Sequence, residues 1–214
     1  MFSIVKKLIK PKVVLMLVFA ALLTFGEAYS QTYSELMISA RKKTLRGEYD
    51  EAIKDYNKAA KLNSGDPGLF FNRAKLKEKN NNPEGAEKDY QKTLELDPKD
   101  EEAMVCLADI QSELGKYQSA LNNINSAIKL DQGNSRLYFT RAKIKFDNMD
   151  FEGAIKDFSK VLEIDPDHAK AFVNRGMAKE ELGKKQAAEE DYSYAISKNP
   201  DLMEAYYNRG SIRI

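Results

Sequence analysis

The feature that most constrains this chain is an alanine that returns every 34 residues. The five alanines are Ala52, Ala86, Ala120, Ala154 and Ala188, and the spacing never slips. The residues around them are also similar, since residues 49–53 read YDEAI and residues 151–155 read FEGAI. A fixed period of this length is typical of a chain built by stacking copies of one supersecondary unit. We therefore expect a repeat architecture rather than a single globular core.

The period divides most of the chain into repeats that begin at residue 33, and positions within a repeat are numbered from 1. The predicted repeats are 33–66, 67–100, 101–134, 135–168, 169–202 and a partial 203–214. Position 8 is always alanine or glycine, position 20 is alanine, and position 24 is tyrosine, isoleucine or phenylalanine. Small residues let two helices approach closely while a large one fills the space beside them. Each repeat is thus predicted to pair two helices tightly.

Turn-forming residues mark where each helix is expected to end. Position 15, between the two helices, is occupied by Gly47, Asn81, Gly115, Met149 and Gly183. Position 32 is Pro98, Pro166 or Pro200 in three full repeats, and Ser64 or Gln132 in the other two. Proline there ends the second helix. Each repeat is therefore predicted to be a helix of about 13 residues, a tight turn and a second helix of similar length.

These residues resemble those of the tetratricopeptide repeat family. The likeness rests on the 34-residue period, the small residues at positions 8, 20 and 27, the aromatic residue at position 24 and the Asp-Pro pair at positions 31 and 32. The resemblance implies an all-α fold, a right-handed α-solenoid of helix-turn-helix units, that acts as a scaffold for protein–protein interactions. One departure is at position 11, where the family often has tyrosine and this chain has Lys43, Lys77, Gln111, Lys145 and Lys179.

The resemblance also implies where a ligand would bind. Family members build the inner wall of their superhelix mainly from the first helix of each repeat, with positions 2, 5, 9, 12 and 13 facing inward. The candidate peptide-binding residues are Phe71, Asn72, Lys75, Phe139, Lys143, Val173, Asn174, Met177 and Tyr207. Alternating apolar and amide or basic side chains suit an extended protein or peptide segment. The carboxylate clamp of the chaperone-binding subset is not expected, because no residue at position 5 is lysine.

Position 5 leaves two interpretations open. Its residues could contact a ligand or could pack against the neighbouring first helix, and the two interpretations are equal for Val105 and Val173. For Phe71, Phe139 and Tyr207 we expect partial exposure, because aromatic rings there exceed what packing needs.

A charge pattern accompanies the repeat. Position 7 is Arg73, Arg141, Arg175 and Arg209, and position 23 is Asp55, Asp89, Asp157 and Asp191. The third repeat replaces both at once, with Leu107 and Asn123. The joint loss indicates that the charges interact, and we expect each arginine to lie between the aspartate of its own repeat and that of the preceding one. A row of arginines binding an anion is the less favoured alternative.

The amino-terminal segment is predicted to be a signal peptide covering residues 1–30. Four lysines precede an apolar run from Val13 to Phe25, which is short for a membrane span. Cleavage is expected between Ser30 and Gln31, with cleavage after Ala28 as the competing site. The alternative is an uncleaved signal anchor that tethers the repeats to a membrane. Either way the repeats are expected outside the cytoplasm of a bacterial cell, in the periplasm or envelope, or secreted.

Composition argues against several classes of function. The chain has 34 basic and 33 acidic residues, which gives no case for a nucleic-acid partner. With one cysteine, Cys106, and one histidine, His168, we expect no metal site, no cofactor and no enzymatic activity. His168 is expected to be a solvated turn residue.

The last segment, 203–214, supplies a first helix without a second one. Tyr206, Tyr207, Ile212 and Ile214 are apolar for a cap, which normally has a polar outer face. The alternative to a peptide-binding scaffold is therefore a structural module that self-associates, for instance as a homodimer, through 203–214.

Overall fold

The computed structural model describes residues 32–212, which fold entirely into helices joined by short turns. The predicted signal peptide and its cleavage site between Ser30 and Gln31 lie outside the described residues. The helices are one over residues 32–45, α3 (Tyr49–Leu62), α4 (Pro67–Lys79), α5 (Pro83–Leu96), α6 (Glu101–Glu113), α7 (Tyr117–Leu130), α8 (Ser135–Asp147), α9 (Phe151–Ile164), α10 (Ala169–Glu181), α11 (Lys185–Lys198) and α12 (Met203–Ile212). The predicted all-α fold is confirmed.

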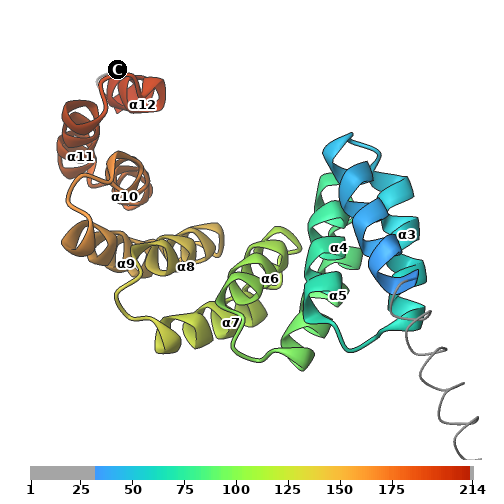
Figure 1. Cartoon of the computed structure of the whole chain (residues 1–214). Coiled ribbons are helices and arrows are strands. Elements are labelled where there is room, and N and C mark those ends of the chain that lie inside the picture. Colours follow the sequence, from blue (N-terminus) through green and yellow to red (C-terminus); the bar gives the residue numbers. More distant parts are fainter. Residues whose placement is uncertain (1–31, 213–214) are drawn as a thin grey trace, which may run out of the picture. The chain divides into compact units, whose positions relative to one another are not determined.

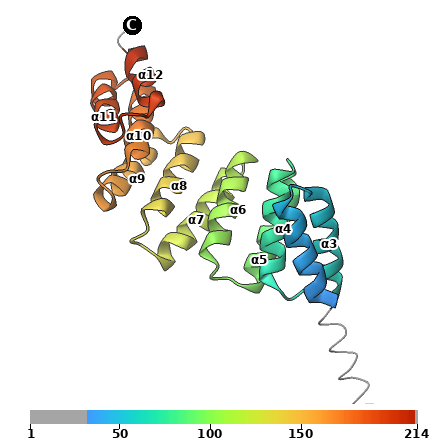
Figure 2. The ribbon, with the colours of Figure 1, turned by 45° about the horizontal axis from the view of Figure 1, so that its top comes forward.

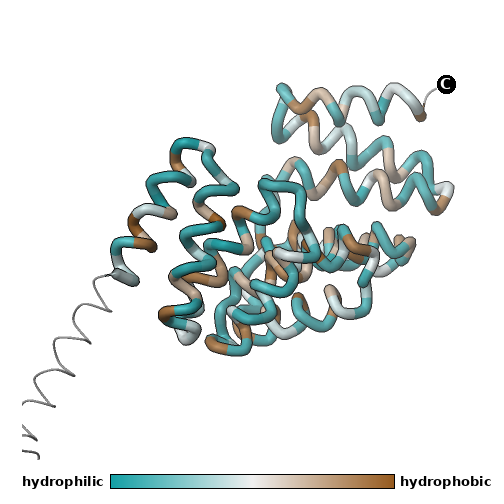
Figure 3. Tube along the Cα trace, turned by 90° about the vertical axis from the view of Figure 1, so that its right-hand side faces the viewer, coloured by the Kyte–Doolittle hydropathy of each residue, from teal (hydrophilic) through white to brown (hydrophobic). Residues whose placement is uncertain are grey.

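The chain divides into two compact units, one ending at Asn82 and one beginning at Pro83. In the first unit, the helix over residues 32–45 is followed by α3, which packs against α4. In the second unit, α6 pairs with α7, α8 with α9 and α10 with α11, and each pair also contacts the helix that follows it (Figures 1 and 2). Hydrophobic residues are interspersed with hydrophilic ones along the helices, as Figure 3 shows. Each helix therefore has an apolar side to bury against its neighbours.

The core repeats with the sequence period. Every alanine at position 20 is fully buried, and every residue at position 24 is at most 2% exposed. The close approach of the two helices is clearest at Gly176, where an added Cβ would come within 2.6 Å of the Tyr192 ring. The predicted pairing of a small position 8 with a large position 24 is therefore observed at this repeat.

The turn at position 15 requires a left-handed backbone. The φ angles are +77° at Gly47, +53° at Asn81, +70° at Gly115, +59° at Met149 and +70° at Gly183. Glycine adopts this conformation without strain and asparagine tolerates it, whereas a long side chain such as that of Met149 is disfavoured there. The predicted turn position is confirmed, and Met149 is the strained member of the set.

The second helix ends at position 30 in every full repeat, whether or not proline follows at position 32. The common feature is an aspartate or asparagine at position 31 whose side-chain oxygen accepts a hydrogen bond from the backbone N–H two residues later. The five acceptors are Asn63, Asp97, Asp131, Asp165 and Asn199, at 2.9 to 3.2 Å. This turn offers the backbone an alternative to the helix. It explains why Ser64 and Gln132 can replace proline without lengthening the helix.

The arginine at position 7 pairs with the aspartate of its own repeat. Arg141 binds Asp157 through Nε and an Nη at 2.8 and 2.6 Å, and Arg175 binds Asp191 in the same way at 2.9 and 2.7 Å. The lysine at position 11 joins each pair, with Lys145 and Lys179 each 2.7 Å from the aspartate. In the sequence these lysines stand out only as departures from the family pattern, so their part in the ion pairs is evident from the structure alone.

The expected bridge to the aspartate of the preceding repeat is wrong for Arg175 and Arg209. Arg175 donates instead to Ser159, at position 25 of the preceding repeat, and Arg209 donates to Ser193, its counterpart one repeat later. Positions 23 and 25 lie about 200° apart around a helix, so they face opposite neighbours. The aspartate faces its own hairpin and position 25 faces the next one.

The third repeat replaces this charged cluster with neutral partners. Asn123 donates to Gln111 at 2.7 Å, so the amides at positions 23 and 11 bond to each other as the charged residues do elsewhere. Leu107, at position 7, is 3% exposed. The joint replacement seen in the sequence therefore extends to a third position, with Gln111 in place of lysine.

Candidate peptide-binding surface

The candidate residues all lie on the first helices of their repeats. Phe71, Asn72 and Lys75 are on α4, Phe139 and Lys143 on α8, Val173, Asn174 and Met177 on α10, and Tyr207 on α12. The structure places the first three in one unit and the other six in the second.

Val173 cannot contact a ligand, and its assignment to the binding surface is corrected. Its side chain is 1% exposed and packs with Ala188, Tyr192, Ala195 and Ala205. Position 5 lies close to the neighbouring helix, so a short branched side chain there is covered completely. Val105, at 2% exposed, shows the same behaviour.

The aromatic residues at position 5 reach further out. Phe71 and Phe139 are half-buried and Tyr207 is 77% exposed, which agrees with the partial exposure expected of them. The Phe139 ring also serves packing, because it stacks on His168 at 5.0 Å and meets the Phe158 ring edge-on at 5.5 Å. One face of Phe139 is thus committed to the joint between two repeats.

His168 differs from the solvated turn residue that was expected. It is the N-cap of α10, where its Nδ1 accepts a hydrogen bond from the backbone N–H of Ala171 at 3.2 Å. Its ring is half-buried against Phe139. An imidazole engaged in a cap and a ring stack is a structural group rather than a general base.

The two candidate asparagines use their amide donors locally. Nδ2 of Asn72 donates to the Gly68 carbonyl at 2.6 Å, and Nδ2 of Asn174 donates to the Lys170 carbonyl at 2.9 Å. Each bond returns to the residue four positions earlier on the same helix, which fixes the side chain. The amide oxygen is the group through which either residue would accept a hydrogen bond from a bound peptide.

The first unit contains a hollow of about 360 Å³ that two consecutive first helices and α3 line together. Its residues are Arg41, Thr44, Leu45, Tyr56, Asn72, Lys75, Leu76 and Lys79. Two of them, Asn72 and Lys75, were predicted from the sequence. The other six were missed, although positions 9 and 13, which supply Arg41, Leu45, Lys75 and Lys79, are among those the resemblance directs inward.

The hollow combines an apolar floor with a basic rim. Tyr56 and Leu76 are each 2% exposed at its base, whereas Leu45 is 88% exposed at its edge. Lys75 Nζ lies 4.9 Å from the centre of the Phe71 ring, and Lys79 Nζ lies 5.7 Å from that of Tyr49. Burial raises the pKa of the Tyr56 hydroxyl, while the charge of Arg41 acts in the opposite direction.

In the second unit, opposite charges meet on the first-helix surface. Arg136 on α8 binds Glu102 on α6 through both terminal nitrogens, at 2.6 and 3.2 Å. The pKa of the Asp109 carboxyl is raised overall, because the surrounding protein partly removes it from water. The nearby charges of Lys143 and Arg136 act in the opposite direction and do not cancel this effect. The candidate residue Lys143 therefore lies in a mixed electrostatic environment.

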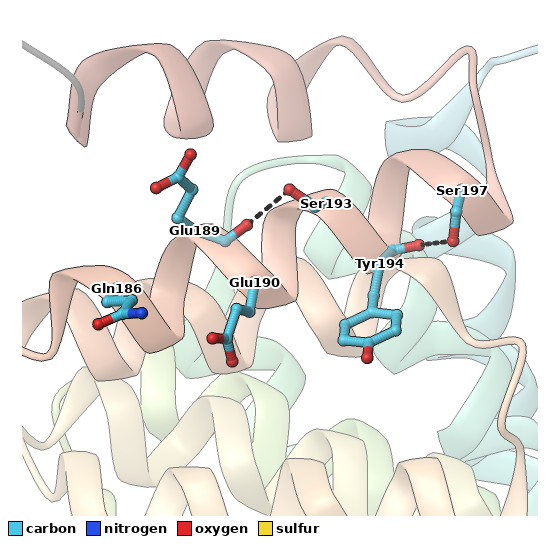
Figure 4. A pocket seen from close by; sticks show the side chains of 6 residues that line it. All are labelled: Gln186, Glu189, Glu190, Ser193, Tyr194 and Ser197. Carbon is cyan, nitrogen blue, oxygen red and sulfur yellow. Dashed lines mark hydrogen bonds between the residues drawn. The ribbon is translucent and has the colours of Figure 1, made fainter.

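A second hollow, of about 510 Å³, lies along α11 and is lined by Gln186, Glu189, Glu190, Ser193, Tyr194 and Ser197 (Figure 4). Its two serine hydroxyl groups donate within the helix, Ser193 to the Glu189 carbonyl at 2.9 Å and Ser197 to the Tyr194 carbonyl at 2.7 Å. The lining also includes the acidic residues Glu189 and Glu190 and a Tyr194 ring that is 57% exposed. Nothing in this group pairs a nucleophile with a base.

Residues 32–212 contain neither a candidate metal-binding cluster nor a candidate membrane-spanning helix. No group of three or more histidine, cysteine, aspartate or glutamate residues is placed there to hold a metal ion. Nor does any helix in that range have the length and apolar character needed to cross a membrane.

Known families match most of the described chain. Profiles described as tetratricopeptide repeat match residues 67–100, 89–122, 107–169 and 139–202, and one described as TPR repeat matches 41–81. No curated protein matches the sequence significantly.

Solved structures share the fold at low sequence identity. The crystal structure of the MamA protein has a TM-score of 0.74 at 23% identity, covering 80% of this chain and 93% of that one. YrrB, described as a TPR protein with an unusual peptide-binding site, has a TM-score of 0.71 at 21% identity, covering 86% and 98%. A tetratricopeptide repeat protein from Parabacteroides merdae has a TM-score of 0.78 at 20% identity, covering 85% and 72%. With the family profiles and the helical hairpins, these likenesses lead to one conclusion: the chain belongs to the tetratricopeptide repeat family.

Proposed function

We propose that this protein is a non-enzymatic scaffold outside the cytoplasm that binds a protein or peptide partner on the surface of its first helices. The observation that carries the proposal is the hollow of the first unit, where an exposed Leu45 stands beside Lys75 and Lys79 on adjacent first helices. An accessible apolar group among polar ones is what an extended peptide needs for affinity and register. YrrB, which shares the fold, is described as having a peptide-binding site.

The proposed location rests on the amino-terminal sequence. A basic start, an apolar run over Val13–Phe25 and small residues before Gln31 fit a signal peptide. Fractionation of expressing cells and amino-terminal sequencing of the mature protein test this. We expect a mature chain that begins at Gln31, or at Tyr29 if the competing site is used. A full-length cytoplasmic protein would contradict the proposed location and leave the binding surface unaffected.

Site-specific photo-cross-linking in expressing cells tests the binding surface. A photoreactive residue replaces Lys75 or Met177 on the first helices, and in matched controls it replaces Lys129 or Lys156, which are exposed on second helices. We expect protein adducts from the first pair and not from the second. Adducts confined to the second helices, or no adducts at any position, would contradict the proposal.

A second candidate function, self-association, is favoured by the exposed side of α12. Met203 is 76% and Tyr207 77% exposed, and the Gly210 position has no heavy atom within 4 Å of an added Cβ. At Gly176 on α10, the equivalent position one repeat earlier, the corresponding space is filled by the Tyr192 ring. Light scattering over a range of concentrations decides this alternative, because a monomer at every concentration removes it.

A further inference from the structure

The hollow of the first unit is distinguished by its charge. Three of its lining residues, Arg41, Lys75 and Lys79, are cationic, and none of its lining residues is acidic. Glu78, which precedes Lys79 in the sequence, is not among the lining residues. A concave surface lined by one sign of charge concentrates the opposite charge near it.

The same positions of the repeat carry a different charge in the second unit. Position 13, which is Lys79 on α4, is Glu113 on α6, Asp147 on α8 and Glu181 on α10. Position 9, which is Arg41 and then Lys75 in the first two repeats, becomes Asp109, Lys143 and Met177. The basic character therefore belongs to the first two repeats and is not a general property of the first-helix surface.

Two of the three cations lie over aromatic rings. Lys75 lies over Phe71 and Lys79 over Tyr49, at 4.9 and 5.7 Å from the ring centres. Such contacts restrain a long side chain while leaving its ammonium group charged, so less entropy is lost when an anionic group binds. The aromatic rings thus prepare the rim for a ligand with negative charge.

The apolar part of the hollow sets a second requirement. Leu45 exposes 88% of its surface at the edge, above a floor of Tyr56 and Leu76. An exposed leucine gains free energy when a partner covers it with apolar surface. A ligand that only carries charge, such as a free inorganic anion, would leave Leu45 uncovered.

We infer that the hollow of the first unit binds an acidic segment of a partner protein, in which aspartate or glutamate side chains flank one apolar residue. The carboxylates contact Arg41, Lys75 and Lys79, and the apolar side chain covers Leu45. This inference rests on the proposed function and names the class of peptide that the first unit selects. Charge complementarity at the rim supplies specificity and a fast association rate.

Selection from a random peptide display library, against the full chain, tests the inference without a known partner. We expect enriched peptides to contain acidic residues around an apolar one. Fluorescence anisotropy measures the affinity for these peptides, and the double substitution Lys75→Glu, Lys79→Glu should lower that affinity by about tenfold or more. The matched control Lys58→Glu, Lys61→Glu changes the charge equally on exposed residues of α3 and should leave binding nearly unchanged. Leu45→Ser should weaken binding by about threefold or more while keeping the charge.

Each other outcome overturns a defined statement. Enriched peptides without acidic residues would overturn the inference and leave the peptide-binding function standing. Acidic peptides that bind the Lys75→Glu, Lys79→Glu variant as tightly as the unmodified protein would show that another surface holds them, and would also overturn it. If binding disappears when the carboxyl terminus of the peptide is amidated, the hollow recognises the terminal carboxylate. That result would overturn the assignment to aspartate and glutamate side chains. A library that yields no enriched peptide would contradict both the inference and the proposed peptide-binding function.

Discussion

The carboxylate of Asp191 accepts two hydrogen bonds from the guanidinium group of Arg175, at 2.9 and 2.7 Å. Asp191 is 2% exposed and also meets Lys179 at 2.7 Å, so one buried carboxylate serves two cations of its own hairpin. The arginine then extends to Ser159 of the preceding hairpin. This arrangement links the two helices of one repeat and the repeat to its neighbour.

Asp191→Asn is expected to lower the free energy of unfolding by about 3 kcal/mol. The substitution leaves Arg175 and Lys179 without their shared anion, and breaking a buried ion pair on one side costs more than the pair contributes. Glu163→Gln, in the exposed pair with Lys160, should change stability by less than about 0.5 kcal/mol. Urea unfolding followed by circular dichroism measures both. Equal losses for the two variants would contradict the role given to Asp191.

The triple variant Arg141→Leu, Lys145→Gln, Asp157→Asn copies the neutral cluster of the third repeat into the fourth. We expect it to be more stable than Asp157→Asn alone by roughly 1 kcal/mol or more, because the neutral partners satisfy one another and no unpaired cation remains. The comparison uses the same unfolding measurement. A triple variant less stable than the single one would show that the three positions do not act as a set.

The lowered pKa of the Asp55 carboxyl leads us to expect that the protein loses stability in acid. Burial, the largest single influence, acts to raise its pKa, but hydrogen bonds from Lys43 and Ser39 and the charge of Lys43 together hold the pKa below its ordinary 3.8. The unfolded state therefore takes up the proton first as the pH falls. The stabilisation is fully present above the ordinary pKa and is lost as the pH falls through the lower pKa of the folded state.

Asp55→Asn should reduce this dependence on pH. Comparing urea unfolding at about pH 6 and about pH 3 measures the difference in stability for each protein. The variant is expected to be less stable than the unmodified chain near neutrality and to lose less on acidification. A pH dependence identical in the two proteins would contradict the assignment.

Met149→Gly is expected to stabilise the chain by about 0.5–1 kcal/mol. The backbone at Met149 has a φ of +59°, where a side chain costs energy that glycine does not incur, and the side chain itself is 78% exposed. The reverse substitution Gly115→Met, at the equivalent turn, should destabilise by a similar amount. Thermal unfolding of both variants tests the pair, and a destabilised Met149→Gly would contradict the explanation.

Ala120→Leu should destabilise the protein by about 1–3 kcal/mol in urea unfolding, because the alanine is fully buried and a larger side chain is expected to overfill the helix contact. Stability near that of the unmodified protein would mean that position 20 is not a close helix contact.

The sequence allowed the hairpin geometry to be predicted, because a period of 34 residues fixes which side of each helix is buried. The turn at Met149 follows from the period, which aligns it with Gly47, and the burial of Ala120 follows from the same period. The partner of Arg175 in the preceding repeat did not follow, since Ser159 and Asp157 differ only by two positions on one helix. Their opposite directions appear only once the helix pair is placed.

The binding surface was less accessible to prediction. Val173 and Phe139 occupy the same position, yet Val173 is covered because its side chain is too short to pass the neighbouring helix, whereas Phe139 reaches the surface. Leu45 and Lys79 were missed because a hollow is a property of two helices together. Reading positions 9 and 13 across consecutive repeats would have found them.

Hydrogen exchange of the full chain, with and without a bound peptide selected from the library, tests the central claim most directly. The account predicts that binding slows exchange in first helices, foremost the helix over residues 32–45 and α4 for an acidic peptide, and leaves α7, α9 and α11 unchanged. Protection confined to those second helices would contradict it.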